Sequence, residues 1–417
     1  MTPRCPPLAV VTVAALALLL PVGGSRAFQQ RAVSAKWITA WGSSQDGLAV
    51  SPVTNVTIRL IARVTISGEA LRIRLDNTFG TAPVLIGKAY VGQRIQGATL
   101  AEGSNRQVSF STSASVTVPP GGNVTSDPVP MKVLAQQDLA VSLYVPESNV
   151  RPSQHAGAKQ TSYLTPNGSG DVAAEETGKP YRDTTTAMLW LKAIDVSSSS
   201  STGSIVAFGD SITDGTCSTL DAHDRWEDWL AVRLRLEAAS RGAKDAHKAI
   251  VNEGIGGNTI TSENLHPPPD SPPGLERLER DVLSHQGITD VVLFMGTNDI
   301  RREAGAAQVI AGMQDIIRRV KGRGPRIVGV TIIPRHNRPV VDNNTGWSPA
   351  KTQVRHEVNT WIRTKAPFDA VIDFDKVVQD PEHPDLIYPP FNCGDGIHPA
   401  PPGYYEMGQA VRLDLFR

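Results

Sequence analysis

Residues 205–211 read Ile-Val-Ala-Phe-Gly-Asp-Ser, an apolar run of four residues followed by a Gly-Asp-Ser turn. An apolar run bounded by turn residues is typical of a strand that is buried on both faces of a parallel sheet. Such a strand ends at the rim of the sheet, where the N–H groups of the following turn face the ligand-binding crevice. We therefore expect an open α/β sheet with Ser211 at its rim, where a nucleophile is accessible.

The chain beyond residue 203 continues as apolar runs separated by stretches of helical periodicity. This alternation predicts a parallel sheet covered by helices on both faces, with right-handed crossovers. We expect strands at 204–208, 248–253, 290–295, 326–333 and 370–374. The helical candidates are 225–241, 275–285, 303–322, 350–365 and a last helix from 402 onward.

The first half of the chain follows a different pattern. From about residue 36 to 195 apolar and polar residues alternate, as in Val56-Thr-Ile-Arg-Leu, and turn residues such as Pro119-Pro-Gly-Gly122 punctuate the runs. This pattern predicts short antiparallel strands with one buried face, hence a β-sandwich or jelly-roll-like domain. The Ser-rich segment 197–203 has linker composition, so we place the domains at 28–196 and 204–417.

The N-terminus has the layout of a secretory signal. A basic start that includes Arg4 precedes an apolar stretch from Leu8 to Val22 and a small-residue segment that ends at Ala27. The apolar stretch is shorter than the roughly 20 residues that a membrane span needs. We therefore expect residues 1–27 to be a signal peptide, the protein to be extracellular or periplasmic, and the chain to have no membrane span.

The charge balance and the number of cysteines further narrow the class of protein. Lys plus Arg and Asp plus Glu both number 41, so no net field favours nucleic acid as a partner. Loss of the signal peptide leaves two cysteines, Cys217 and Cys393, which can form a disulfide in an oxidising compartment or stay as two buried thiols. The chain has no Cys-x-x-Cys or His-Glu-x-x-His motif, and we expect neither a metal nor a cofactor.

Three further segments stand at strand ends or before helices. They are Asn252-Glu-Gly-Ile-Gly-Gly257-Asn-Thr259, Gly296-Thr-Asn-Asp299 and Asp395-Gly-Ile-His398. Together with Gly-Asp-Ser211, and in this order, they make residues 203–417 resemble the SGNH or GDSL hydrolase family. The resemblance implies a flavodoxin-like three-layer fold and gives the matching residues the roles that follow.

Acyl transfer requires a nucleophile, a base and donors for the developing oxyanion. Ser211 is the candidate nucleophile, His398 the base that accepts its proton, and Asp395 the group that orients the imidazole. The candidate oxyanion donors are the backbone N–H groups of Ser211 and Gly257 and the side-chain amide of Asn298.

Two other histidines need an interpretation. Asp380-Pro-Glu-His383 repeats the Asp-x-x-His spacing, so His383 remains an alternative base. The prolines of this segment favour a surface loop. His155 lies in the β-rich half, and we expect it to be a hydrogen-bonded loop residue.

These features together predict a secreted serine esterase that hydrolyses carboxylic esters through an acyl-enzyme, with short acyl or acetyl esters favoured. Its substrate would be a small-molecule or carbohydrate ester. The rival hypothesis is a carbohydrate-binding protein that uses the same scaffold without turnover. The β-rich half would form one wall of the crevice or bind a polymer, and we favour the wall because ligand sites concentrate at domain interfaces. The sequence makes no prediction of the oligomeric state.

Overall fold

The apolar run that precedes Ser211 forms the second strand of a five-stranded parallel sheet. In the computed structural model this strand is β18 (Ser204–Gly209), and the sheet order is β19-β18-β20-β21-β22. The other strands are β19 (Ala249–Gly254), β20 (Ile288–Phe294), β21 (Arg326–Val330) and β22 (Ala370–Ile372), which confirms all five predicted strands to within a few residues.

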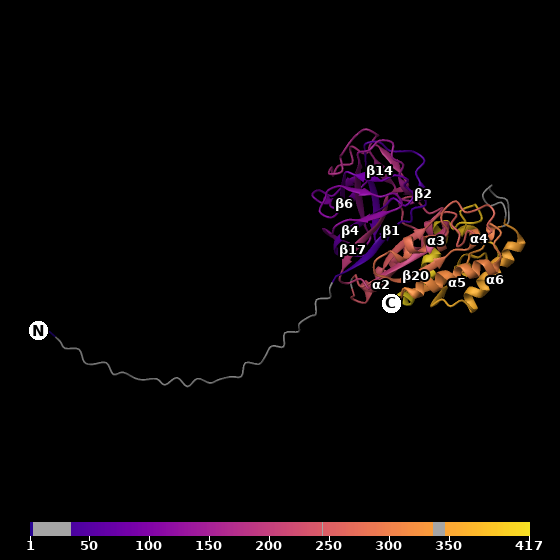
Figure 1. Cartoon of the computed structure of the whole chain (residues 1–417). Helices are drawn as coiled ribbons and strands as arrows, with labels where there is room; N and C mark the ends of the chain where they lie inside the picture. The colour runs from indigo at the N-terminus through magenta and orange to yellow at the C-terminus, as the bar shows by residue number, and fades with distance from the viewer. Residues whose placement is uncertain (3–34, 244, 337–346) are drawn as a thin grey trace. The chain divides into compact units, whose positions relative to one another are not determined.

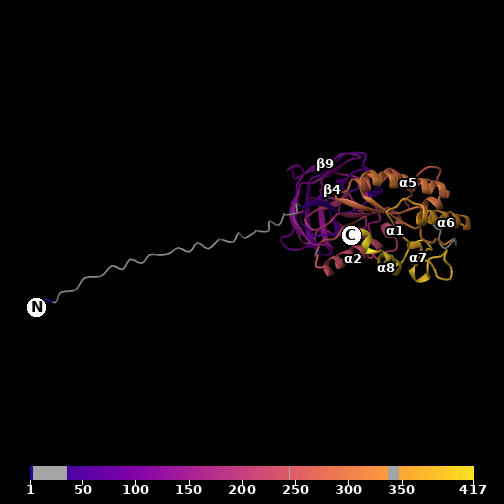
Figure 2. The ribbon, with the colours of Figure 1, turned by 90° about the horizontal axis from the view of Figure 1, so that it is seen from below.

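Helices cover both faces of this sheet, as the alternating pattern predicts. Val206 and Phe208 of β18 point into one core, whereas Ile205 and Ala207 point into another. The first core is closed by α3 (Gly274–Leu278), α5 (Ala306–Gly322) and α6 (Pro349–Thr364). The second is closed by α2 (Trp226–Ser240), α7 (Phe374–Val378) and α8 (Pro401–Ala410), and Figure 2 shows α5 and α8 on opposite sides of the sheet.

The first half of the described chain consists of antiparallel strands. One sheet contains β1 (Lys36–Gly42), β17 (Leu191–Ser198), β4 (Gly68–Asp76), β10 (Asn123–Thr125) and β11 (Val129–Val133). The other contains β15 (Asp183–Thr185), β14 (Ser162–Leu164), β3 (Val56–Val64), β12 (Gln137–Val145), β6 (Lys88–Gln96), β7 (Thr99–Leu100) and β8 (Arg106–Val108). Apolar residues of both sheets, such as Ile73 and Val141, share one core, as in a sandwich.

The polar face of the first sheet is also buried, which the alternating sequence did not predict. Arg74, Lys192 and Asp195 stand on this face and are each less than a tenth exposed. Their partners belong partly to the second half of the chain, since Lys192 Nζ lies 2.8 Å from Asp281 Oδ1. The strands are therefore buried on both faces, one face against apolar residues and the other against polar ones.

The edge of the parallel sheet lies against this polar face. A Cβ on Gly42 of β1 would come within 2.6 Å of Val251 in the edge strand β19, and Thr65 Oγ1 accepts a hydrogen bond from the N–H of Ile250 at 2.9 Å. The contact protects β19 from pairing with other chains. The two halves meet in Figure 1 where β1 and β17 approach the helical part.

The structure describes residues 1–2, 35–243, 245–336 and 347–417, and Ala35–Arg417 form one unit. The expected signal peptide lies outside these residues except for its first two. Within the described ranges no helix is both long and apolar enough to cross a membrane. Residues 197 and 198, which we assigned to the linker, are the end of β17, and Ser201 Oγ donates to the His247 carbonyl at 2.7 Å.

Candidate active site

Ser211 is the first residue of a helix that is only one turn long, α1 (Ser211–Asp214). Asp210 caps this helix, because its side chain accepts a hydrogen bond from the Ile212 N–H at 3.0 Å. Gly209 before it cannot carry a side chain, since a Cβ would lie 2.1 Å from Thr213 Oγ1. The Gly-Asp-Ser sequence thus produces a tight strand-to-helix turn that places the hydroxyl at the sheet rim.

The structure brings Ser211, His398 and Asp395 together although 187 residues separate the first two. Ser211 Oγ lies 2.8 Å from His398 Nε2, and His398 Nδ1 lies 2.5 Å from Asp395 Oδ2. The carboxylate accepts from Nδ1, so Nε2 of a neutral imidazole is left to accept the serine proton. This geometry is that of a nucleophile, base and orienting acid.

Asp395 is held in its ionised form. Burial alone would raise its pKa, but the hydrogen bond and charge of His398, with the backbone N–H groups of His398 and Ile397, outweigh burial and hold the pKa of Asp395 at about 2. The N–H groups of Ile397 and His398 donate to Asp395 Oδ1 at 2.8 and 2.9 Å. The short spacing in Asp395-Gly-Ile-His398 therefore lets one carboxylate bind both the backbone and the imidazole of its own turn.

The alternative base, His383, lies on an exposed turn. Its N–H donates to Asp380 Oδ1 at 3.1 Å, so this Asp-x-x-His segment repeats the backbone turn of the other one. The imidazole that contacts Ser211 is that of His398. The geometry favours His398 as the base.

The candidate oxyanion donors lie at the starts of α1 and α4 (Thr297–Arg301) and in the loop after β19, and hydrogen bonds connect these segments. The Ile255 N–H donates to the Gly209 carbonyl at 3.2 Å, and Asn298 Nδ2 donates to the Asn258 carbonyl at 3.0 Å, leaving its second N–H for another acceptor. Gly257 has φ +69°, a conformation that favours glycine, and no protein atom lies within 4 Å of a Cβ placed there. Glycine at position 257 therefore suits the backbone conformation, and the absence of a Cβ also lets a substrate approach the N–H.

Arg277 of α3, which no sequence motif singles out, connects the ends of β18 and β19 with the loop that follows β19. Its guanidinium is buried and donates to the carbonyls of Gly209 and Glu253 at 2.9 Å each and to Asn258 Oδ1 at 3.0 Å. A further N–H donates to Ser44 Oγ of the β-rich half at 2.9 Å. No local pattern marks this arginine, because its partners are spread over more than 200 positions.

Two buried carboxyl groups close to the site were also missed as functional candidates. Burial raises the pKa of Asp299 to about 7, although the N–H groups of Ile260 and Thr261 donate to it. Burial likewise raises the pKa of Asp210 to about 6, against the charge of His398. Through these two N–H groups Asp299 fixes the segment that follows Gly257, and it does not cap its own helix α4, whose N-cap is Gly296.

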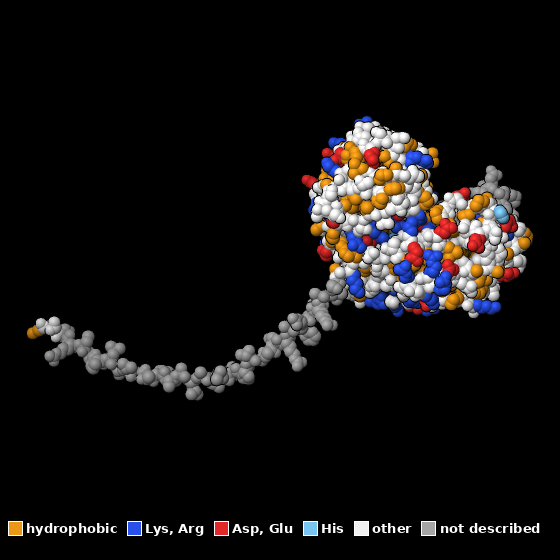
Figure 3. Space-filling view, in the orientation of Figure 1, with side chains coloured by type: hydrophobic (Ala, Val, Ile, Leu, Met, Phe, Trp, Pro, Cys, Tyr) orange, Lys and Arg blue, Asp and Glu red, His pale blue; other side chains and the backbone are white. Residues whose placement is uncertain are grey.

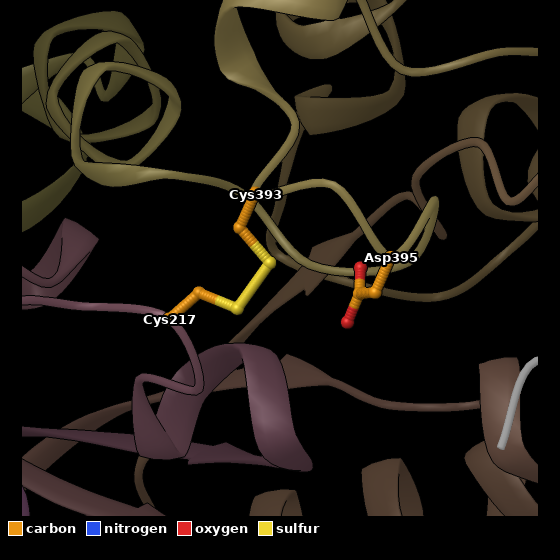
Figure 4. Close-up of side chains that lie close together, drawn as sticks. All are labelled: Cys217, Cys393 and Asp395. Carbon is orange, nitrogen blue, oxygen red and sulfur yellow. A yellow bond between two sulfur atoms is a disulfide. The ribbon is translucent and has the colours of Figure 1, made fainter. Parts of the chain in front are cut away.

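Cys217 and Cys393 form a disulfide, which is one of the two alternatives that the sequence left open. Figure 4 shows that Cys393 and Asp395 belong to one loop, whereas Cys217 comes from the segment after α1. In the described part of the chain, these two cysteines and Asp395 are the one group of three potential metal ligands. Because disulfide sulfurs are not thiolates, this group does not have the character of a metal site.

His155 does not lie in a loop, contrary to our expectation. It ends β13 (Ser153–His155), which pairs with β2 (Gly47–Leu48) and β16 (Met188–Leu189). Its imidazole is hydrogen-bonded as expected, but one partner is Asp214 of α1, with Nε2 2.9 Å from Oδ1. The β-rich half therefore contacts the helix that carries Ser211.

Surface charge shows no single-sign field on the face drawn in Figure 3, where acidic side chains lie among the lysines and arginines. This distribution agrees with the equal numbers of acidic and basic residues. Nothing on this face indicates a nucleic-acid interface.

Known proteins are similar to about half of this chain. Solved structures with similarity include a carbohydrate acetylesterase from Sinorhizobium meliloti (19% identity, TM-score 0.40, covering 51% of this chain and 97% of that one). Another is the M. smegmatis aryl esterase (18%, TM-score 0.39, 51% and 99%). No curated protein matches the chain. Residues 207–405, just under half of the chain, match the family described as GDSL-like lipase/acylhydrolase.

Proposed function

We propose that the protein is a secreted serine esterase that hydrolyses carboxylic esters through an acyl-enzyme, with short acyl or acetyl esters favoured. The observation that carries the proposal is the hydrogen-bonded chain from Ser211 Oγ through His398 to Asp395, with distances of 2.8 and 2.5 Å. These hydrogen bonds supply an activated hydroxyl, and the residues lie in the region that matches a family of acylhydrolases.

In the first half of the proposed reaction Ser211 Oγ attacks the ester carbonyl carbon while its proton moves to His398 Nε2. The carbonyl becomes an oxyanion, which the N–H groups of Ser211, Gly257 and Asn298 would stabilise. Collapse of this intermediate breaks the bond to the alcohol oxygen, and His398 gives its proton to the leaving alkoxide. The products of this half are a free alcohol and an ester of Ser211.

In the second half water attacks the acyl-enzyme, with His398 Nε2 taking its proton. The second tetrahedral intermediate expels Ser211 Oγ, which recovers the proton from His398, and a carboxylic acid leaves. Asp395 remains ionised throughout because its pKa is held near 2. Its role is to keep the imidazole oriented and to stabilise the imidazolium.

Secretion and the choice of short acyl groups rest on separate arguments. The Cys217–Cys393 disulfide suits an oxidising compartment, which agrees with a signal peptide at residues 1–27. An aromatic content of 6% disfavours a long-chain lipid site, because such sites are lined by apolar and aromatic side chains.

The proposal includes the domain assignment. Residues 28–198, which include all of β17, would be the β-sandwich or jelly-roll-like domain, 199–203 the connecting segment and 204–417 the hydrolase domain. The parallel sheet order β19-β18-β20-β21-β22, or 2-1-3-4-5 in chain order, supports a flavodoxin-like arrangement for the last of these.

The test is hydrolysis of p-nitrophenyl acetate and butyrate by the mature protein and by Ser211→Ala, His398→Ala and His383→Ala. We expect Ser211→Ala and His398→Ala each to lower kcat by about 10⁴-fold or more, with the acetate preferred over the butyrate by the wild type. His383→Ala is the matched control for the base and should retain wild-type kcat. A folded wild type that is inert on both esters and unlabelled by a fluorophosphonate would instead support the carbohydrate-binding hypothesis.

A further inference from the structure

The β-rich half places a histidine against the helix of the candidate nucleophile. His155 ends β13 and is 3% exposed. Its Nε2 lies 2.9 Å from Asp214 Oδ1, and its Nδ1 lies 2.8 Å from the carbonyl oxygen of Ser44. Both ring nitrogens are therefore occupied, and neither contacts Ser211, so His155 is not a second base for the serine.

Asp214 lies close to both the candidate nucleophile and a candidate oxyanion donor. It is the last residue of α1, and Ser211 is the first, so the two lie one helical turn apart. Asp214 Oδ2 lies 3.5 Å from the Cβ position of Gly157 and 3.7 Å from that of Gly256. The carboxylate thus stands between a turn of the β-rich half and the loop that carries the candidate oxyanion donor Gly257.

The end of α1 has little space in which to move. A Cβ on Gly254 would lie 2.2 Å from the backbone nitrogen of Asp214, so the helix rests directly on the end of β19. A shift of Asp214 would therefore be transmitted to Ser211 through one rigid turn and to Gly256 through direct packing. Misplacement of reacting groups by about 1 Å can lower a rate about 100-fold.

The partners of His155 show that it is a cation. The Ser44 carbonyl and the Asp214 carboxylate are both acceptors, so both ring nitrogens must carry a proton. A second carboxylate, that of Asp46, lies 3.7 Å from Nδ1. Burial would lower the pKa of His155, but the charges of Asp214 and Asp46 raise it to about 9.

We propose that His155 is a positioning residue of the esterase: its imidazolium holds the Asp214 carboxylate, and so fixes the turn of α1 that presents Ser211 beside the Gly256–Gly257 loop. The inference rests on the proposed function and extends it, because it gives the β-rich half a part in the reaction beyond forming a wall. The hydrolase region then depends on a charge that lies 56 positions before Ser211 in the chain.

The test compares two buried histidines at the same interface. His285 Nε2 lies 2.6 Å from Glu253 Oε1, so His285→Ala also breaks a buried histidine–carboxylate pair between elements, but one that does not contact α1. The measurements are kcat and KM for p-nitrophenyl acetate, the rate of fluorophosphonate labelling, and Tm. Because labelling reports the reactivity of Ser211 and Tm reports packing, these measurements distinguish a loss of positioning of Ser211 from a general loss of stability.

We expect His155→Ala to lower kcat about 10- to 100-fold while KM changes less than about threefold, with labelling slowed by the same factor as kcat. His285→Ala should lower Tm at least as much but leave kcat within about threefold of wild type. Asp214→Asn should lower kcat as His155→Ala does, and the double variant should be no slower than either single one. If His155→Ala does not fold, His155→Gln, which keeps a donor toward Asp214 but no charge, takes its place.

The outcomes that overturn the inference differ from those that overturn the esterase proposal. A wild type that neither hydrolyses esters nor reacts with the fluorophosphonate overturns both. An active wild type whose His155 variants keep kcat within about threefold overturns the positioning role alone. Equal losses of kcat in His155→Ala and His285→Ala also overturn it, because they would show only a general effect of interface packing.

Discussion

The candidate site residues of the α/β half (204–417) and the buried charges of the β-rich half stand at different places relative to their strands. In the α/β half the candidate site residues follow the carboxyl ends of strands, as Ser211 does after β18. In the β-rich half buried charges such as Arg74 and Asp195 stand inside strands, on the face turned toward the other half. The position after a strand leaves the candidate reactive groups at the edge of the parallel sheet, where a substrate can reach them. The position inside a strand lets the buried charges connect the β-rich half to the α/β half.

The contrast shows that the halves contribute differently to one site. The reacting groups of the proposed mechanism all come from the α/β half. The groups that hold the loops around them, including His155 and Ser44, come partly from the β-rich half. Variants of the reacting groups should therefore lose activity with little loss of stability. Variants of the holding groups should lower the free energy of unfolding, and those at His155 should lower kcat as well.

The largest effect should come from Asp395→Asn. Asparagine keeps the shape but presents an N–H toward His398 Nδ1, which favours the wrong tautomer, so we expect kcat to fall about 10⁴-fold with little change in Tm. Steady-state kinetics on p-nitrophenyl acetate provide the measurement. The control is Asp380→Asn, because Asp380 accepts the N–H of His383 at 3.1 Å in the same kind of turn and should leave kcat unchanged. A similar loss in both variants would contradict the assignment of Asp395.

The next largest effect concerns the disulfide within the α/β half. Cys217 and Cys393 are 176 positions apart, so their link removes chain entropy worth about 5 kcal/mol from the unfolded state. The double variant Cys217→Ser/Cys393→Ser should lose stability of this order in urea unfolding, and without residues 1–27, which contain Cys5, it has no free thiol. A reducing agent should lower the stability of wild type but not of the double variant. Unchanged wild-type stability under reduction would contradict the prediction.

Arg277→Met tests the connection between the halves. The variant leaves the carbonyls of Gly209 and Glu253 and the Asn258 amide oxygen without this donor, and we expect the free energy of unfolding to fall by about 3–5 kcal/mol. Arg318→Met is the matched control, because that side chain is 74% exposed in its ion pair with Asp315 and should change stability by less than about 0.5 kcal/mol. Equal effects in urea unfolding would show that Arg277 is not a structural connection.

More of the α/β half could be predicted from the sequence than of the interface between the two halves. Apolar runs located all five parallel strands. The Gly-Asp-Ser turn after one of them and the Asp-x-x-His segment before the last helix singled out Ser211 and His398, which the structure brings together. The pairing of His155 with Asp214 spans 59 positions and leaves no local pattern. The alternation of apolar and polar residues in β4 shows that one face of the strand is polar. It cannot show whether that face lies in water or is buried against the polar side chains of the other half. The helices α1 and α4 were missed because four or five residues show no periodicity.

The smallest effect is a dependence of stability on pH that belongs to the β-rich half. His155 has a pKa of about 9 in the folded protein against 6.5 in the unfolded chain, so the folded state binds more protons between these values. Its contribution, on the order of 3 kcal/mol, is complete below about pH 6.5 and is lost as pH rises through about 9. Urea unfolding between pH 6 and 10 should show this decline.

A second group acts in the same direction and must be separated from His155. Burial raises the pKa of Glu227 to about 8, so the stability that it confers by binding a proton in the folded state also falls as pH rises from about 4.5 through 8. The contribution of His155 is therefore the difference between wild type and His155→Gln at each pH. That difference should shrink between pH 7 and 10, since glutamine does not titrate, while the decline due to Glu227 persists in the variant. A difference that stays constant across this range would mean that the imidazole is already neutral at pH 7, and that the pairing with Asp214 holds α1 by a hydrogen bond without charge.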